Sequence, residues 1–240
     1  MKKLTAAIQY ECFTYDKYIW IFYAIQYAIV LAIYLMIGFF MGSFEDIGTN
    51  CLEINTIIYV GILGVLGFQE DFKMLLQSGF SRKYIFLATV SLFAFISGIM
   101  SLIDTLVGNG LHVWLGNYTS LFGGIYGYGN LFANWIWLFL FYALICSLLY
   151  LGILIIHKIG KTASIYLGIG LGGLILIITA LFRYVLSAET VDAILSCFRK
   201  MMGFADSGAL RYLFPCLTFL LLIAVLGAGS YAVIRRTELK

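Results

Sequence analysis

The chain has 240 residues, of which 62% are hydrophobic and 11% are charged, with one proline and a formal net charge of +3. Charged residues make up about 25% of an average soluble domain, so this composition excludes a soluble globular protein. The Lys and Arg residues form clusters separated by long uncharged apolar stretches, which indicates an integral membrane protein with several crossings.

Six membrane spans are predicted from these stretches, because a bilayer core of about 30 Å requires about 20 apolar residues in a helix. The longest stretch, 105–157, divides at 108–130, where Gly, Asn, Tyr and Ser favour turns. The second span is short for a crossing. The predicted spans are 18–44, 54–69, 84–107, 132–156, 163–182 and 212–234. We therefore expect an all-α integral membrane protein with a single transmembrane domain over 1–240.

The basic residues predict how the chain is oriented, because loops near the cytoplasmic ends of spans retain Lys and Arg. Most of the bases lie in the N-terminal segment, in the loops after the second and fourth spans, and in the C-terminal tail. Both termini are therefore expected in the cytoplasm. The last external segment is the exception, since it contains four bases that include Arg199 and Lys200.

The residues before the first span show the spacing of an amphipathic helix. Leu4, Ala7 and Ile8 fall near one face. Glu11 and Asp16 interrupt the apolar core that a secretory signal peptide requires. We therefore expect an interfacial helix along the inner leaflet, followed by a first span that is retained.

Four residues of the first span permit two interpretations. In one, they line a path for an amphipathic peptide. In the other, the tyrosines belong to interfacial belts and helix packing, which are common places for aromatic residues in membrane proteins. The residues are Tyr23, Gln26, Tyr27 and Tyr34.

The loop after the second span has the clearest pattern among the cytoplasmic segments. Its apolar residues follow the spacing of one helix face, which predicts a short amphipathic helix over about 70–80. Gly79 can end this helix, and Ser81 can cap the next one. One interpretation is an ordinary interfacial helix that joins two spans, and the other is a docking element for a cytoplasmic partner.

Candidate reactive groups are few and scattered. Asp104 is expected near the outer end of the third span, and a role in ion or proton coupling stays open because intramembrane carboxylates are costly. His112 and His157 are expected on opposite sides of the membrane, so no catalytic set is predicted. The cysteine spacing fits no metal site. Cys51 and Cys197 are both expected outside, either as a disulfide or as small packing residues.

A third amphipathic helix is expected between the fifth and sixth spans, over about 188–202. Ser187 is a suitable N-cap, Glu189 falls in the first turn, and Gly203 can end the helix. Its apolar stripe comprises Val191, Ile194, Leu195, Phe198 and Met202. The helix either dips into the outer leaflet or lies on the surface without a role.

This order of elements resembles the permease subunits of the ABC-2 type exporter family over nearly the whole chain. The most local likeness is the run Gly79-Phe80-Ser81-Arg82-Lys83 followed by Phe86. It looks like the Gly-x-Ser-Arg segment that enters the third span in small permeases of bacterial peptide and bacteriocin exporters. The resemblance implies that the helix after the second span is a coupling helix, which contacts a separate ATPase. The residues with this implied role are Glu70, Asp71, Phe72, Leu75, Leu76, Phe80 and Arg82.

The resemblance also implies partners and a location. Small members of the family, among them lantibiotic-immunity transporters and exporters of phenol-soluble modulins, work as two permeases with two ATPases. We therefore expect a second permease copy, identical or related, in a bacterial plasma membrane. ATP and Mg²⁺ belong to the ATPase, and no cofactor, metal or nucleic acid is expected on this chain.

The expected function is export of an amphipathic or antimicrobial-type peptide, with an external gate between the fifth and sixth spans. The chain itself is not expected to be an enzyme, because its cytoplasmic segments are too short to fold as a domain. The expected gate residues are Val191, Leu195, Phe198 and Met202. The alternative is a membrane immunity or anchor protein that binds a peptide or partner without transporting it.

Overall fold

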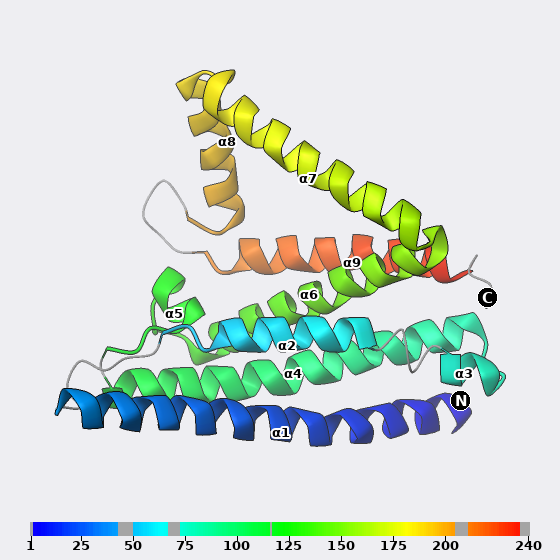
Figure 1. Cartoon of the computed structure of the whole chain (residues 1–240), viewed down its shortest axis with the longest axis horizontal. Helices are drawn as coiled ribbons and strands as arrows, with labels where there is room; N and C mark the ends of the chain where they lie inside the picture. Colours follow the sequence, from blue (N-terminus) through cyan, green and yellow to red (C-terminus); the bar gives the residue numbers. More distant parts are fainter. Residues whose placement is uncertain (1, 43–49, 67–72, 116, 205–210, 236–240) are drawn as a thin grey trace.

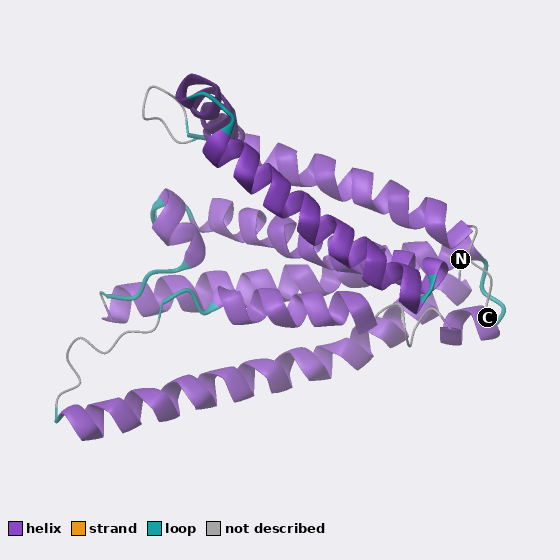
Figure 2. Cartoon of the chain, turned by 45° about the horizontal axis from the view of Figure 1, so that its top comes forward, coloured by secondary structure: helices purple, strands orange, loops and turns teal. Residues whose placement is uncertain are grey.

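The computed structural model describes every residue except 1, 43–49, 67–72, 116, 205–210 and 236–240. All regular secondary structure in this described part is helical (Figures 1 and 2). The helices are α1 (Lys2–Met41), α2 (Glu53–Leu66), α3 (Lys73–Gln77), α4 (Arg82–Leu115), α5 (Leu121–Tyr126), α6 (Leu131–Ile159), α7 (Lys161–Tyr184), α8 (Ala188–Met201) and α9 (Leu213–Arg235).

Five of these helices are long and apolar enough to cross a membrane: α1, α4, α6, α7 and α9. The prediction of a multi-pass α-helical membrane protein is confirmed at this level. Helix α2 has 14 residues, which correspond to a length of about 21 Å. It is therefore shorter than the bilayer core, and the remainder of the predicted second span lies largely outside the described residues.

The ends of the bundle differ in what they contain. The start of α1, the end of α9 and the whole of α3 lie at one end of the bundle, which we call the terminal end (Figure 1). Helices α5 and α8 lie at the other end, which we call the far end. The start of α1, the end of α9 and α3 thus lie close to one another, while the placement of both termini in the cytoplasm stays a prediction.

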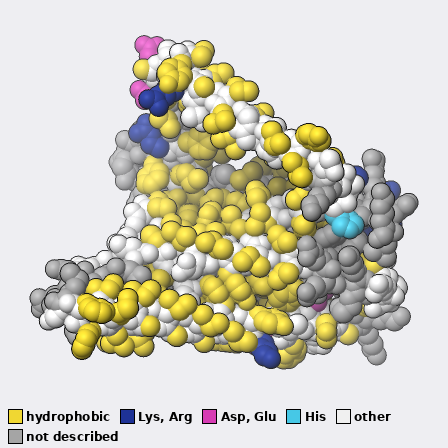
Figure 3. Space-filling view, viewed as in Figure 1, with side chains coloured by type: hydrophobic (Ala, Val, Ile, Leu, Met, Phe, Trp, Pro, Cys, Tyr) yellow, Lys and Arg dark blue, Asp and Glu magenta, His cyan; other side chains and the backbone are white. Residues whose placement is uncertain are grey.

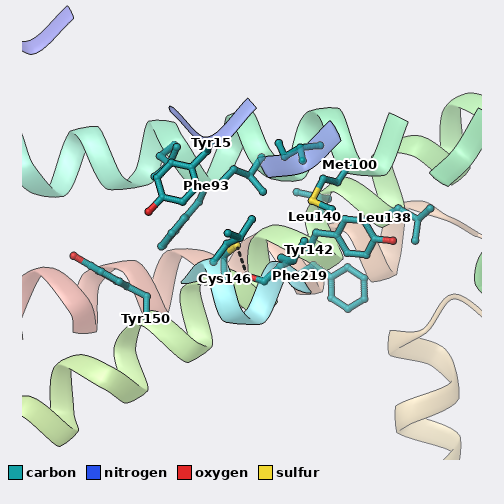
Figure 4. Packing of buried hydrophobic residues seen from close by; sticks show 14 of the residues in the cluster. Tyr15, Phe93, Met100, Leu138, Leu140, Tyr142, Cys146, Tyr150 and Phe219 are labelled. Atoms are coloured by element: carbon teal, nitrogen blue, oxygen red, sulfur yellow. Dashed lines mark hydrogen bonds between the residues drawn. The ribbon is translucent and has the colours of Figure 1, made fainter. Parts of the chain in front are cut away.

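Helix α6 is at the centre of the bundle, where it packs against α2, α4 and α9, while α4 also packs against α1. The interface between α4 and α6 is built from fully or nearly fully buried side chains, such as Phe93 and Met100 facing Leu138, Tyr142 and Cys146 (Figure 4). These residues recur at helical spacing on both helices, which places one apolar stripe of each against the other.

Helices α7 and α8 form an arm that projects from the bundle (Figure 1). Helix α7 packs mainly against the end of α6, and every described side chain of α7 is at least partly exposed. The space-filling view shows a hollow between this arm and the body, with hydrophobic side chains on its walls (Figure 3). An arm with such an apolar surface requires lipid or another protein around it.

The N-terminal segment departs from expectation. A separate interfacial helix before the first span is wrong for the described residues, because α1 runs as a single helix from Lys2 to Met41. Neither Gly nor Pro occurs between Lys2 and Ile37, so nothing in this stretch breaks the helical backbone. The first 17 residues therefore extend the first membrane helix.

Close helix packing occurs at Gly61 and Gly64, and not at the glycine pairs that the sequence pattern favours. The Gly-x-x-x-Gly pairs of the first and fifth spans favour close helix contacts, but a Cβ added at Gly42, Gly168 or Gly172 would meet nothing within 4 Å. Instead, Gly61 and Gly64 bring α2 onto α6. A Cβ at Gly64 would lie 2.9 Å from the backbone oxygen of Cys146. The short helix α2 is thus held to the bundle by backbone contact.

Candidate functional site

A buried carboxyl group joins three helices in the interior of the bundle. Asp104 lies on α4 and is only 5% exposed. Its Oδ1 accepts a hydrogen bond from the Tyr23 hydroxyl of α1 at 2.9 Å, and its Oδ2 accepts one from the Tyr142 hydroxyl of α6 at 2.5 Å. The Tyr23 hydroxyl is also 3.0 Å from the carbonyl oxygen of Met100. Asp104 is therefore the polar link between α1, α4 and α6.

A second buried acid lies about one helical turn towards the far end. Glu53, at the start of α2, is 2% exposed, and its Oε1 lies 3.3 Å from the position of a Cβ added at Gly108. Gly108 follows Asp104 by four residues on α4, which corresponds to about 6 Å along the helix axis. The Tyr118 hydroxyl donates to Glu53 Oε2 at 3.4 Å. The absence of a side chain at Gly108 makes room for Glu53.

Tyr118 connects this acid to the loop between α4 and α5. Burial, and next the nearby Glu53, raise the pKa of the Tyr118 phenol above its usual value. The phenol therefore stays protonated at neutral pH and is available as a donor to the carboxylate. Its oxygen also accepts a bond from the Leu52 backbone N–H at 3.4 Å, and Gln26 donates to the Leu52 carbonyl at 3.3 Å.

Several buried oxygens around these acids have no hydrogen-bond partner. The Thr56 side chain is 0% exposed and lies beside both Asp104 and Tyr23, yet its hydroxyl oxygen makes no hydrogen bond of normal geometry. Glu53 Oε1 is also without a partner. Buried polar atoms are nearly always hydrogen-bonded in folded proteins, so this concentration is unusual.

We call these residues the Asp104 cluster: Tyr23, Glu53, Thr56, Asp104, Tyr118 and Tyr142. The ionisable or hydroxyl groups that act on Asp104 are phenols, Thr56 and the second acid, and none of them is a cation. Groups of three or more His, Cys, Asp or Glu residues that could hold a metal ion do not occur in the described part of the chain. The oxygens of the cluster come from two carboxyl groups, three phenols and one hydroxyl group.

The structure changes the interpretation of the expected peptide path in α1. Tyr23 and Gln26 are buried against α4 and the chain before α2, and Tyr27 stacks on Tyr23 with ring centroids 5.7 Å apart. Tyr34 lies about three turns from Tyr23 and about two turns from Tyr27 along the helix. These residues therefore do not line an open path together, because two of them pack within the protein. Helical spacing alone does not distinguish a lining side chain from a buried one.

The expected coupling helix is only partly described. Glu70, Asp71 and Phe72 lie outside the described residues, and α3 covers Lys73–Gln77. Gly79 ends this helix as expected. It has a φ of +77°, its N–H donates to the Leu76 carbonyl, and the Phe80 N–H donates to the Leu75 carbonyl. This pair of bonds is a Schellman motif, which only a residue tolerant of positive φ can complete.

The apolar face of α3 points into the protein. Leu75 is 4% exposed, and Leu76 and Phe80 pack against the buried core. These three side chains therefore attach α3 to its own bundle, and the coupling role that the resemblance implies for them stays a prediction. Gln77 and Ser78 are the exposed described side chains of this segment.

Arg82 has a partner within the chain. Its guanidinium donates to the backbone carbonyl of Arg235, in the last turn of α9. Carbonyls at the end of a helix lack an intrahelical donor, so a cation placed there is stabilising. Arg82 thereby ties the start of α4 to the end of α9.

Helix α8 forms over the expected residues, but it does not close against the bundle. Ser187 caps it, since its side chain accepts a bond from the Thr190 N–H. Three of the expected gate residues, Leu195, Phe198 and Met202, are exposed. Val191 is half-buried. These residues therefore do not seal the bundle in this structure.

Two open pockets border α9. One, of about 570 Å³, lies between α8 and α9 and is lined by residues that include Lys200, Met201, Arg211 and Phe214. The other, of about 630 Å³, lies between α4, α6 and α9 and is lined almost wholly by apolar side chains, among them Phe86, Phe93, Phe139 and Leu220.

All five cysteines are free, including Cys51 and Cys197.

Comparison of the chain with protein-family models, with curated proteins and with solved structures gave no match.

Proposed function

We propose that this chain is the membrane-spanning subunit of an ABC-type exporter, which moves an amphipathic or antimicrobial-type peptide out of the cytoplasm or the inner leaflet. A separate ATPase subunit supplies the energy. The proposal places the chain in a bacterial plasma membrane, with six spans, both termini in the cytoplasm and a second permease copy beside it. In this arrangement α2, together with residues that follow it, makes the short second span.

The observation that carries this proposal is the mechanical connection of α3. A four-residue turn joins α3 to α4, and Leu75 fixes α3 to the core. Arg82, the first residue of α4, is bonded to the end of α9. A push on α3 at the terminal end therefore reaches α4 and α9 together. Such a rigid connection is what a partner needs in order to move two membrane helices at once.

The apolar pocket between α4, α6 and α9 supports a path for the peptide. Two of its three walls are the helices that α3 and Arg82 connect, so a movement at the terminal end changes the width of this pocket. Its lining includes Val90 and Ile223, with Ser147 and Tyr231 as polar groups. An amphipathic helix buries its apolar face in a groove of this kind. This path replaces the one expected along α1.

The partner ATPase should be captured with the chain, and an obstacle on the exposed side of α3 should prevent its capture. We expect Gln77→Trp to reduce the amount of ATPase that copurifies by about tenfold, which corresponds to about 1.4 kcal/mol of binding free energy. The full chain is tagged, expressed in its native host and extracted in mild detergent, and the captured ATPase is quantified by mass spectrometry.

Ala193→Trp provides the matched control, because Ala193 is an exposed residue of a helix at the far end. This variant should retain the ATPase. Equal capture by both variants would show that α3 is not the docking site. If no ATPase accompanies the wild-type chain, the exporter proposal itself fails.

A further inference from the structure

The hydrogen-bond contacts around Asp104 bear on how many protons the cluster holds. Tyr23 has one hydroxyl hydrogen but two acceptors within reach, Asp104 Oδ1 at 2.9 Å and the Met100 carbonyl at 3.0 Å. If Asp104 is ionised, Tyr23 can donate to only one of them. If Oδ1 carries a proton, it donates to the Tyr23 oxygen, and Tyr23 donates to Met100. With this proton present, each of these contacts is a separate two-centre hydrogen bond.

The surroundings of Asp104 also favour a neutral carboxyl. The titratable groups that face it are Tyr23 and Tyr27 on α1, Glu53 on α2, Tyr142 on α6, and Tyr118 in the loop after α4. None of these groups brings a positive charge. An isolated charge in a low-dielectric interior is strongly disfavoured, and a second acid nearby increases the cost.

Thr56 and Glu53 add further buried oxygen atoms to the surroundings of Asp104. The Thr56 hydroxyl oxygen and Glu53 Oε1 are buried without hydrogen-bond partners, and Thr56 lies directly beside Asp104 and Tyr23. The Thr56 hydroxyl carries its own hydrogen and can donate it to a carboxyl oxygen of Asp104. Native structures rarely leave buried acceptors unsatisfied.

We propose that Asp104 is a proton-binding site inside the membrane bundle, with Glu53 as the acid through which the proton is exchanged towards the far end. A proton bound to Asp104 Oδ1 gives a neutral carboxylic acid that bridges α1 and α4 and accepts from Tyr142 of α6. Its release leaves a carboxylate, with Glu53 as the next acceptor about one helical turn away. This site does not depend on the proposed exporter function, and it can exist in a protein with another role.

Infrared spectroscopy of the full chain in lipid nanodiscs tests this proposal, because a protonated carboxyl has a C=O band that is separate from the carboxylate bands. We expect this band at neutral pH in the wild type. Asp104→Asn should remove one carboxyl equivalent of its intensity. Asp192→Asn, a control on exposed α8, should leave the band unchanged. Tyr142→Phe should shift the band to higher frequency, because the C=O group loses its donor.

Two further conditions separate the possible outcomes. Glu53→Gln should retain the Asp104 band, and a change of NaCl concentration at constant pH should not alter it. The proposal is overturned if the wild type lacks the band at neutral pH, or if neither Asp104→Asn nor Tyr142→Phe affects it. Loss of the whole band in Glu53→Gln would assign the proton to Glu53, and displacement by Na⁺ would identify a cation site. Either of these results also contradicts the proposal.

Discussion

Replacement of Asp104 by alanine should destabilise the folded bundle by about 1 to 3 kcal/mol. The substitution leaves the Tyr142 hydroxyl without its acceptor and removes the Asp104 partner of the Tyr23 hydroxyl, in a place where neither tyrosine reaches solvent. Interhelical hydrogen bonds in membrane proteins contribute about 0.6 kcal/mol on average and up to about 1.7 kcal/mol. Loss of both bonds and of the carboxyl volume accounts for the range. Reversible unfolding in mixed micelles measures the free energy of unfolding.

Asparagine at position 104 distinguishes the contribution of a polar side chain from that of a charged one. Asp104→Asn retains one acceptor oxygen and gains an N–H donor in the place of the carboxyl proton, so it imitates the neutral acid. We expect its free energy of unfolding at neutral pH to stay within about 0.5 kcal/mol of the wild type, because the amide keeps partners for both tyrosine hydroxyls. A loss as large as that of Asp104→Ala would mean that Asp104 functions as an ionised carboxylate.

Replacement of Gly64 by valine should separate α2 from α6. The first side-chain atom alone would lie 2.9 Å from the Cys146 backbone oxygen and 3.1 Å from its Cα, and neither atom can move without the helix. Overpacking of a close contact lowers the free energy of unfolding by about 1 to 3 kcal/mol. Contacts with the backbone of another helix are the least able to adapt. We expect a lower free energy of unfolding and faster proteolysis near α2.

Gly152→Val is the matched control, since Gly152 lies in α6 and a Cβ there would meet nothing within 4 Å. Glycine and valine are both weak helix formers, so the control accounts for propensity. The control should unfold at nearly the wild-type free energy. Similar losses in both variants would show that helix propensity, and not the contact between α2 and α6, causes the effect.

The sequence predicts the parts of this fold that depend on local chemistry. Long apolar stretches give the five long helices, Gly79 ends α3 and Ser187 caps α8. Each of these features needs only the residues within one or two turns. The positions of the basic residues likewise predict which helix ends lie together, and the placement of α3 near both chain ends agrees with them.

The candidate site could be predicted only in part. Asp104 is conspicuous in the sequence as an acid in an apolar span, but its partners lie far away in the chain, 81 residues before it for Tyr23 and 38 after it for Tyr142. Which faces of α1, α4 and α6 meet is decided by packing of the whole bundle. The contact of Gly64 with α6 was missed for the same reason, because a glycine in an apolar helix carries no sign of what approaches it.

The apolar surface of the arm explains why some expected contacts are absent. The apolar residues expected to form a gate on α8 are mostly exposed, and α7 is covered by few protein contacts within one chain. Apolar spacing identified the helices correctly, but lipid, a second copy and the same chain can all cover an apolar face. Spacing alone does not decide between them.

The central claim is that ATP hydrolysis on a partner drives peptide movement through this chain. The most direct test is transport into inside-out vesicles that contain the chain and its copurified ATPase, with a fluorescent amphipathic peptide added outside. The account predicts that the peptide accumulates inside only when ATP and Mg²⁺ are present, and that Gln77→Trp abolishes the accumulation. Accumulation that is equal without ATP, or in vesicles without this chain, would contradict it.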